Sequence, residues 1–218
     1  MLKCNKATKC TPNGEINLKN YDSSHIKNIT IAGHSGSGKT SLCEALLYKA
    51  GVTDRLGKTQ DGNTVSDYTP IEVLKKCSIY TSLSFYEKDG YKVNILDTPG
   101  LFDYAGGLVE GVFAADCVMI AVSAKSGIHV GTKKAYDAAV AHKTPHMFVV
   151  TKIDDENANF SNVLTSLKIE FGSNVCPLVV PIIKDSKIVS YYDLLEMKNY
   201  KYGPKGERID AGEPDPTY

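Results

Sequence analysis

The sequence predicts an α/β fold in which helices cover both faces of a mostly parallel central sheet. Three observations predict this fold. Short runs rich in Val and Ile alternate with helix-forming segments along residues 27–184, a rhythm typical of parallel strands joined by helices. One strand-to-helix junction carries three glycines and a lysine. An Asp-Gly pair separates two β-rich runs, which indicates a hairpin and therefore one antiparallel edge strand. The expected architecture is a three-layer sandwich.

The composition is that of an ordinary globular protein. The 218 residues are 42% hydrophobic and 23% charged, and the 25 basic residues equal the 25 acidic ones. No overall field therefore attracts nucleic acid or a membrane, so no direct DNA partner and no membrane partner are expected. No apolar run approaches the 18 residues that a membrane-spanning helix requires.

The cysteines and the start of the chain predict a cytoplasmic protein. Six cysteines occur without a C-x-x-C pair. Four lie in apolar runs and are expected to be buried free thiols, which favours a reducing compartment; these are Cys43, Cys77, Cys117 and Cys176. The first residues contain no apolar segment of the kind found in secretory signals.

The first half of the chain begins with a polar stretch. Residues 1–26 contain turn formers and little periodicity, and are predicted to be a loose N-terminal arm. The apolar run 28–33 predicts a strand, and residues 41–51 predict a helix that Gly51 closes. Residues 52–76 are polar without a sustained period and predict a long loop, which in a compact domain is usually functional or mobile. Two β-rich runs then flank Asp89-Gly90.

The second half repeats the alternation of helices and strands. Helices are expected at 108–115, 133–142 and 159–172, and strand-forming runs at 117–124, 146–154 and 175–183. After Lys184 this rhythm ends. Residues 187–203 resemble a small hairpin or helix-hairpin appendage, and the last residues resemble a frayed end.

The glycine-rich junction, GHSGSGKT at residues 33–40, fits the phosphate-loop pattern G-x-x-x-x-G-K-[S/T]. In such a loop the main-chain N–H groups surround a polyphosphate, and glycines leave room for it at the positive end of the new helix. Lys39 is predicted to bridge the outer phosphates in catalysis, and the Thr40 hydroxyl to ligate Mg²⁺. The alternative is a tight turn that contains a lysine by chance. The candidate nucleotide-binding residues are His34, Ser35, Gly36, Ser37, Gly38, Lys39, Thr40 and Ser41.

The sequence ILDTPG, residues 95–100, places a second candidate group after a strand. Asp97 can hold Mg²⁺ through water, and Gly100 can present its N–H to a γ-phosphate as a catalytic group. D-x-P-G also forms a good turn, which is the alternative.

The sequence TKID, residues 151–154, ends a later strand and is predicted to select the base. The Asp154 carboxylate can accept hydrogen bonds from both N1–H and the exocyclic amine of guanine, and adenine offers no such pair of donors. The Lys152 stem can lie along the base, and Thr151 precedes it. A solvated charge cluster is the alternative. All three motifs stand at carboxyl ends of strands, where open α/β sheets bind ligands.

With these motifs in place, residues 27–202 resemble the N-terminal G domain of elongation factor G-like translational GTPases. The resemblance implies a P-loop NTPase fold, GTP/GDP and Mg²⁺ as ligands, and hydrolysis of GTP. It implies the ribosome as partner, through C-terminal domains that the chain lacks. Ser78 stands where the family has a threonine that ligates Mg²⁺. By this resemblance, residues 27–184 are the G domain and residues 185–218 the start of an inserted subdomain in a truncated chain.

Two departures from the family pattern bear on activity. Thr151 replaces the asparagine of N-K-x-D, which weakens one base contact. Leu101 replaces the histidine that follows D-T-P-G, and a leucine cannot hydrogen-bond the attacking water. A nucleotide-dependent binding module with little hydrolysis is therefore an alternative function, and an ATP-using P-loop enzyme is another, against which Asp154 argues.

Overall fold

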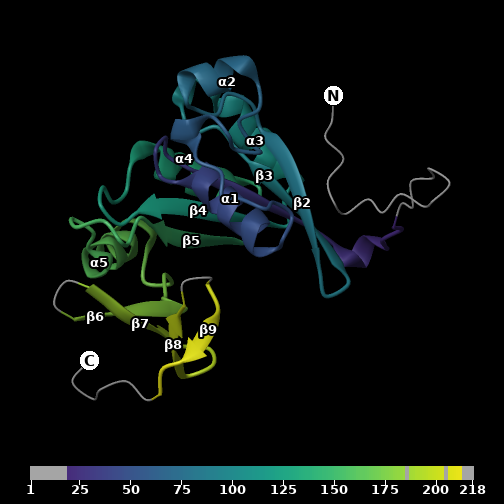
Figure 1. Cartoon of the computed structure of the whole chain (residues 1–218). Coiled ribbons are helices and arrows are strands. Elements are labelled where there is room, and N and C mark those ends of the chain that lie inside the picture. The colour runs from purple at the N-terminus through teal and green to yellow at the C-terminus, as the bar shows by residue number, and fades with distance from the viewer. Residues whose placement is uncertain (1–18, 185–186, 204–205, 213–218) are drawn as a thin grey trace. The chain divides into compact units, whose positions relative to one another are not determined.

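The computed structural model describes residues 19–184, 187–203 and 206–212, and these form two compact units (Figure 1). The first unit contains the described residues up to Val122 together with His129–Val149, and the second contains Ser123–Ile128 and the described residues from Val150 onward. Most of the predicted N-terminal arm lies outside the described residues. Its last part includes a single 3₁₀ turn, η1 (Ser23–His25).

The central sheet has the predicted mixed topology. Its five strands follow the order β2-β3-β1-β4-β5. β1 pairs in parallel with β3 and β4, whereas β2 pairs antiparallel with β3. In the β2–β3 turn, Asp89 and Gly90 both have positive φ, 50° and 83°, as a two-residue I′ hairpin requires. The strands are β1 (Ile26–Gly33), β2 (Ser82–Lys88), β3 (Tyr91–Asp97), β4 (Cys117–Ser123) and β5 (His146–Thr151).

Helices of the first unit cover both faces of this sheet (Figure 1). Helix α1 (Lys39–Lys49) packs on β1 and β3, while α3 (Ala105–Ala114) and α4 (Val130–Ala141) pack on β1. Side chains of β1 alternate accordingly. Ile31 lies in the buried cluster with Leu47 of α1, and the neighbouring Thr30 hydroxyl donates a 2.7 Å hydrogen bond to the Gly111 carbonyl of α3. The predicted three-layer sandwich is confirmed.

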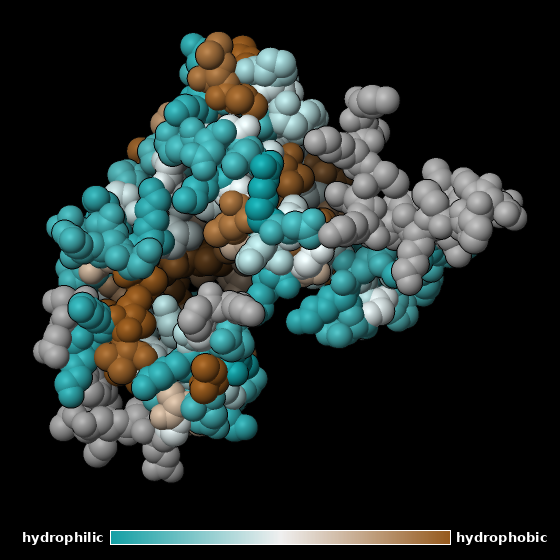
Figure 2. All heavy atoms as spheres, in the orientation of Figure 1, coloured by the Kyte–Doolittle hydropathy of each residue, from teal (hydrophilic) through white to brown (hydrophobic). Residues whose placement is uncertain are grey.

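The segment between α1 and β2 is more regular than predicted. It contains a 3₁₀ turn, η2 (Thr59–Asp61), and a helix, α2 (Pro70–Lys75). Thr69 and Glu72 form a capping box, and proline occupies the first turn, so the local signal T-x-x-E for a helix was present. Apolar side chains gather at the surface over α2 (Figure 2), where Ile71 and Leu74 are 47% and 78% exposed.

The second unit contains a helix and an antiparallel sheet. α5 (Phe160–Phe171) begins at Asn159, whose side chain caps the Asn162 N–H at 2.9 Å. The sheet order is β6-β7-β8-β9, with β6 (Val179–Lys184), β7 (Lys187–Asp193), β8 (Lys198–Tyr202) and β9 (Arg208–Asp210). This sheet thus begins before Lys184, the predicted end of the G domain, and β9 lies in the predicted frayed end. The domain boundaries themselves stay a prediction.

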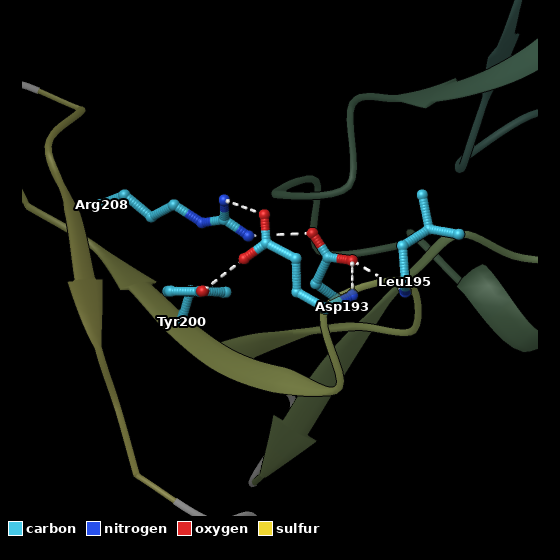
Figure 3. Close-up of polar contacts among 5 residues, drawn as sticks. Asp193, Leu195, Tyr200 and Arg208 are labelled. Atoms are coloured by element: carbon cyan, nitrogen blue, oxygen red, sulfur yellow. Dashed lines mark hydrogen bonds and ion pairs between the residues drawn. The ribbon is translucent and has the colours of Figure 1, made fainter.

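A polar network joins β9 to the turn between β7 and β8 (Figure 3). Arg208 contacts Asp193 at 2.8 Å and Glu196 at 3.2 Å. The Tyr200 hydroxyl donates to Glu196 at 2.6 Å, and the Arg208 guanidinium lies 3.5 Å from the centre of the Tyr200 ring. One arginine of β9, a strand only three residues long, thus contacts three side chains.

The cysteines are less buried than predicted. Cys43 is a buried free thiol, but Cys77 and Cys117 are only half-buried and Cys176 is exposed, because the latter three lie at the ends of apolar runs. In the part of the chain that the structure describes, no helix is long and apolar enough to span a membrane.

Candidate functional site

The phosphate-loop sequence forms a wide turn between β1 and α1. Gly33, Gly36 and Gly38 have φ of 137°, 74° and 88°, which residues with a side chain rarely adopt. A Cβ on Gly33 would also lie 2.6 Å from the Ala121 carbonyl oxygen of β4. The predicted contributors His34, Ser35 and Ser37 lie within this turn, and Ser41 is exposed in the first turn of α1.

Lys39 begins α1 with its side chain buried. It is 6% exposed, and its ammonium donates a 3.0 Å hydrogen bond to the His34 carbonyl. Burial lowers the pKa of Lys39, and the carboxylates of Asp97 and Asp67 partly oppose this effect. The loop therefore holds a desolvated cation directed at its own main chain, at the position where the outer phosphates are expected.

Two buried carboxylates lie near this cation. Asp97 ends β3 and is 1% exposed. Asp67 lies between η2 and α2 and is 4% exposed. No main-chain N–H of the described residues donates a hydrogen bond to either carboxylate. Burial raises the pKa of Asp97 to about 6 and also raises the pKa of Asp67, although the hydroxyls of Thr40 and Ser66 beside Asp97, and of Ser78 beside Asp67, oppose this effect. Two buried carboxylates with so little compensation are costly, so they indicate a ligand.

Asp67 is a site residue that the sequence interpretation missed. In the sequence, an aspartate within a polar stretch cannot be told apart from one exposed to solvent. Only the folded chain brings Asp67 close enough to Asp97 for its charge to raise the Asp97 pKa. The nearest usable signal was the capping box that begins at Thr69, which predicts an ordered segment beside it.

Two hydroxyls complete a set of oxygen groups that suits Mg²⁺. The Thr40 and Ser78 hydroxyl oxygens lie 3.2 Å apart. The described residues contain no group of three His, Cys, Asp or Glu arranged to hold a metal. Mg²⁺ usually takes one or two carboxylates together with substrate phosphates, so Thr40, Ser78, Asp67 and Asp97 fit that ion.

Gly100 lies against the phosphate loop. A Cβ at this position would collide with the Lys39 ammonium and lie 2.7 Å from the Ser35 nitrogen. Only glycine allows this approach, which brings the main chain after β3 to the loop. The next residue, Leu101, is 37% exposed.

The predicted base-binding residues belong to the second unit. The Thr151 carbonyl accepts a 2.8 Å hydrogen bond from the Ala124 N–H, and Lys152 has a positive φ of 54°. The exposed Asp154 lines a pocket of about 930 Å³ together with Tyr191 and Tyr202. The first unit thus brings the candidate phosphate and metal residues together, and the second carries the candidate base-reading residues.

Comparisons with known proteins agree with this arrangement. Residues 24–208 match the family described as the elongation factor Tu GTP binding domain. An "Elongation factor G-like protein" of Mycobacterium tuberculosis is 37% identical over 72% of this chain and 22% of the relative. The protein "Ribosome-releasing factor 2, mitochondrial" of Culex quinquefasciatus is 32% identical over 78% of this chain and 23% of the relative.

A solved structure is also similar. A crystal structure of a protein from Thermus thermophilus matches 88% of this chain and 29% of that chain, with a TM-score of 0.81 and 36% identity. The chain therefore spans about a quarter of the length of these proteins. The P-loop fold and the resemblance to elongation factor G-like G domains are confirmed, and the chain belongs to the elongation factor Tu GTP-binding domain family.

Proposed function

We propose that this domain binds GTP with Mg²⁺ and hydrolyses the β–γ bond to GDP and phosphate, within a translational GTPase whose nucleotide state controls its interaction with the ribosome. The observation that carries the proposal is the pair of buried carboxylates, Asp67 and Asp97, beside the buried Lys39. A bound cation would offset the cost of burying two like charges, and a polyanion would balance that cation and Lys39.

Each residue around the phosphates has a role in this proposal. The main-chain N–H groups of residues 34–40 bind the phosphate oxygens, and Lys39 neutralises the charge that develops on them. Thr40 and Ser78 ligate the metal, while Asp97 and Asp67 hold it directly or through water. When bound, Mg²⁺ supplies charge neutralisation at the β- and γ-phosphates. The Gly100 N–H contacts the γ-phosphate and responds to its loss.

Recognition of guanine is assigned to Asp154. Its carboxylate accepts hydrogen bonds from N1–H and the exocyclic amine, and each charge-assisted bond contributes about 1.5–3 kcal/mol. Lys152 lies along the base. Because Thr151 lacks the amide of asparagine, this contact set is smaller than in the family pattern.

The rate of hydrolysis depends on Leu101. Its side chain cannot orient a water molecule, so turnover without a partner is expected to be on the order of 10⁻⁴ s⁻¹ or less. The same residue favours the second candidate function, a nucleotide-dependent binding module with little hydrolysis.

The ribosome is proposed as the partner because the relatives are named an elongation factor G-like protein and a ribosome-releasing factor. We assign this contact to regions like those that make up the remaining length of the two relatives, of which this chain covers 22% and 23%. The compartment is one that contains ribosomes. The cytoplasm is the first candidate, and the name of the mosquito relative makes mitochondria the second.

Competition between fluorescent GTP and ATP tests the nucleotide assignment. Asp154→Ala is expected to weaken GTP binding at least about 100-fold, because two charged hydrogen bonds of about 1.5–3 kcal/mol each are lost, and to leave ATP binding unchanged. Glu156→Ala, an exposed carboxylate two residues away, is the matched control and should change neither. Equal affinity of the wild-type protein for GTP and ATP would contradict the proposal.

Single-turnover assays separate the two candidate functions. Cleavage of GTP that ribosomes accelerate supports the GTPase. If bound GTP stays intact with and without ribosomes, the domain is a binding module.

A further inference from the structure

Two buried glutamates hold the segment between α1 and β2. Glu44 of α1 accepts hydrogen bonds from the N–H groups of Gly57, at 3.2 Å, and Val65, at 2.6 Å. Glu72 of α2 accepts from Ile79, at 3.0 Å, and Tyr80, at 3.1 Å. Both glutamates are 1% exposed. Glu44 thus orders the first half of the segment and Glu72 the second.

The Glu72 carboxylate is satisfied on both of its oxygens. One oxygen accepts from Ile79 and Tyr80, and the other accepts from the main-chain N–H of Thr69, at 3.2 Å, and from its hydroxyl, at 2.6 Å. Burial alone would raise the pKa of Glu72, but these hydrogen bonds outweigh burial and hold its pKa below the ordinary value. Glu72 is therefore ionised at neutral pH, and it needs no cation.

The residues that Glu72 holds follow Ser78 directly in the chain. A main chain fixed at residues 79 and 80 limits where the Ser78 side chain can point. Its hydroxyl lies 3.2 Å from that of Thr40.

We propose that Glu72 is a positioning residue that holds Ser78 beside Thr40, where both hydroxyls can serve the metal. This inference rests on the proposed function, because the position of Ser78 matters only if Mg²⁺ and GTP bind there.

The matched control is Glu44. It is as buried as Glu72 and also accepts main-chain hydrogen bonds from the same segment, but its partners lie 13 or more residues before Ser78. A variant of Glu44 therefore loses a comparable structural contact without releasing Ser78.

The experiment measures how much Mg²⁺ improves the affinity for a non-hydrolysable GTP analogue, relative to EDTA. Glu72→Ala should reduce that gain about 10- to 100-fold, the usual effect of removing a partner that orients a metal ligand. Glu44→Ala can lower the gain through Asp67, because its partner Val65 lies two residues before Asp67, but its loss should add in full to that of Ser78→Ala. Glu72→Gln should retain part of the gain, because the amide oxygen can still accept from Ile79 and Tyr80, whereas its NH₂ cannot accept from the Thr69 N–H.

A double-mutant cycle identifies the route of the effect. In a Ser78→Ala background, Glu72→Ala should reduce the gain no further, because the residue that it positions is gone. A full additional loss would overturn the inference. Hydrogen exchange on the wild-type protein with the GTP analogue and Mg²⁺ bound tests it without any variant that could misfold. The Ile79 and Tyr80 amides should be protected, and exchange at the rate of an unstructured chain would overturn it.

The outcomes separate the inference from the function on which it rests. If the wild-type protein gains no affinity from Mg²⁺, the proposed function fails and the inference fails with it. If the wild-type protein gains affinity and folded Glu72→Ala keeps the gain, the function stands and only the inference is overturned.

Discussion

Replacing Asp97 with asparagine is expected to stabilise the nucleotide-free domain and to weaken its binding of Mg²⁺ with GTP. Asp97 is 1% exposed, and no main-chain N–H of the described residues donates to its carboxylate. Burial raises its pKa from 3.8 to about 6, although the Lys39 ammonium opposes the change. Above pH 6 the folded protein therefore contains an ionised carboxylate that the unfolded chain would hydrate.

The magnitude follows from this difference in pKa. Between pH 3.8 and 6 the unfolded chain releases the Asp97 proton before the folded protein does, so the free energy of unfolding falls as the pH rises. At 1.36 kcal/mol per pH unit the loss is about 1 kcal/mol at pH 4.5 and about 3 kcal/mol at pH 7.5. Asparagine avoids this loss but also gives up the attraction to Lys39. The expected gain at pH 7.5 is therefore about 1–3 kcal/mol.

Urea unfolding without nucleotide or metal, at pH 7.5 and pH 4.5, measures this effect. Asp97→Asn should be more stable than the wild-type protein at pH 7.5, and the difference should shrink at pH 4.5. Asp61→Asn, an exposed aspartate in η2, should behave as the wild-type protein at both values. A variant less stable than the wild-type protein at pH 7.5 would refute the reasoning. In binding assays, Asp97→Asn should lose most of the affinity that Mg²⁺ adds for GTP.

Three further changes have defined expectations. Gly100→Ala should weaken binding of a GTP analogue by at least about tenfold and binding of GDP less, because the added methyl group displaces Ser35 and Lys39. Errors of about 1 Å at such sites can cost about 100-fold. Equal losses for both nucleotides would argue against a γ-phosphate contact. Leu101→His should raise the rate of single-turnover hydrolysis by about 100-fold, because it restores a side chain that can orient water. Leu101→Ala should not raise this rate. An unchanged rate for the histidine variant would show that another feature limits the reaction. Arg208→Ala should speed hydrogen exchange of the β9 amides and leave those of β2 and β3 unchanged, since Arg208 contacts Asp193, Glu196 and Tyr200; protection that persists in β9 would mean that main-chain pairing alone orders this strand.

Several parts of this protein were determined by short stretches of sequence. Asp89-Gly90 predicts a two-residue hairpin because few residues adopt positive φ in succession, and the turn has that geometry. The glycines of residues 33–40 predict a turn wide enough for phosphate for the same reason. The alternation of helices with Val- and Ile-rich strands predicts a covered parallel sheet, since strands buried on both faces need apolar side chains throughout.

Other features were decided only by tertiary structure. Asp67 has no local pattern that separates it from a surface aspartate, and its role follows from burial near Asp97. Glu72 was recognisable as part of a helix cap, but its contacts with Ile79 and Tyr80 depend on how the chain returns after α2. The apolar run that contains β6 could pair in either sheet, because an apolar run does not specify its neighbours. Local sequence thus determined conformation, whereas the balance of buried charge arose from contacts between segments that only the folded chain brings together.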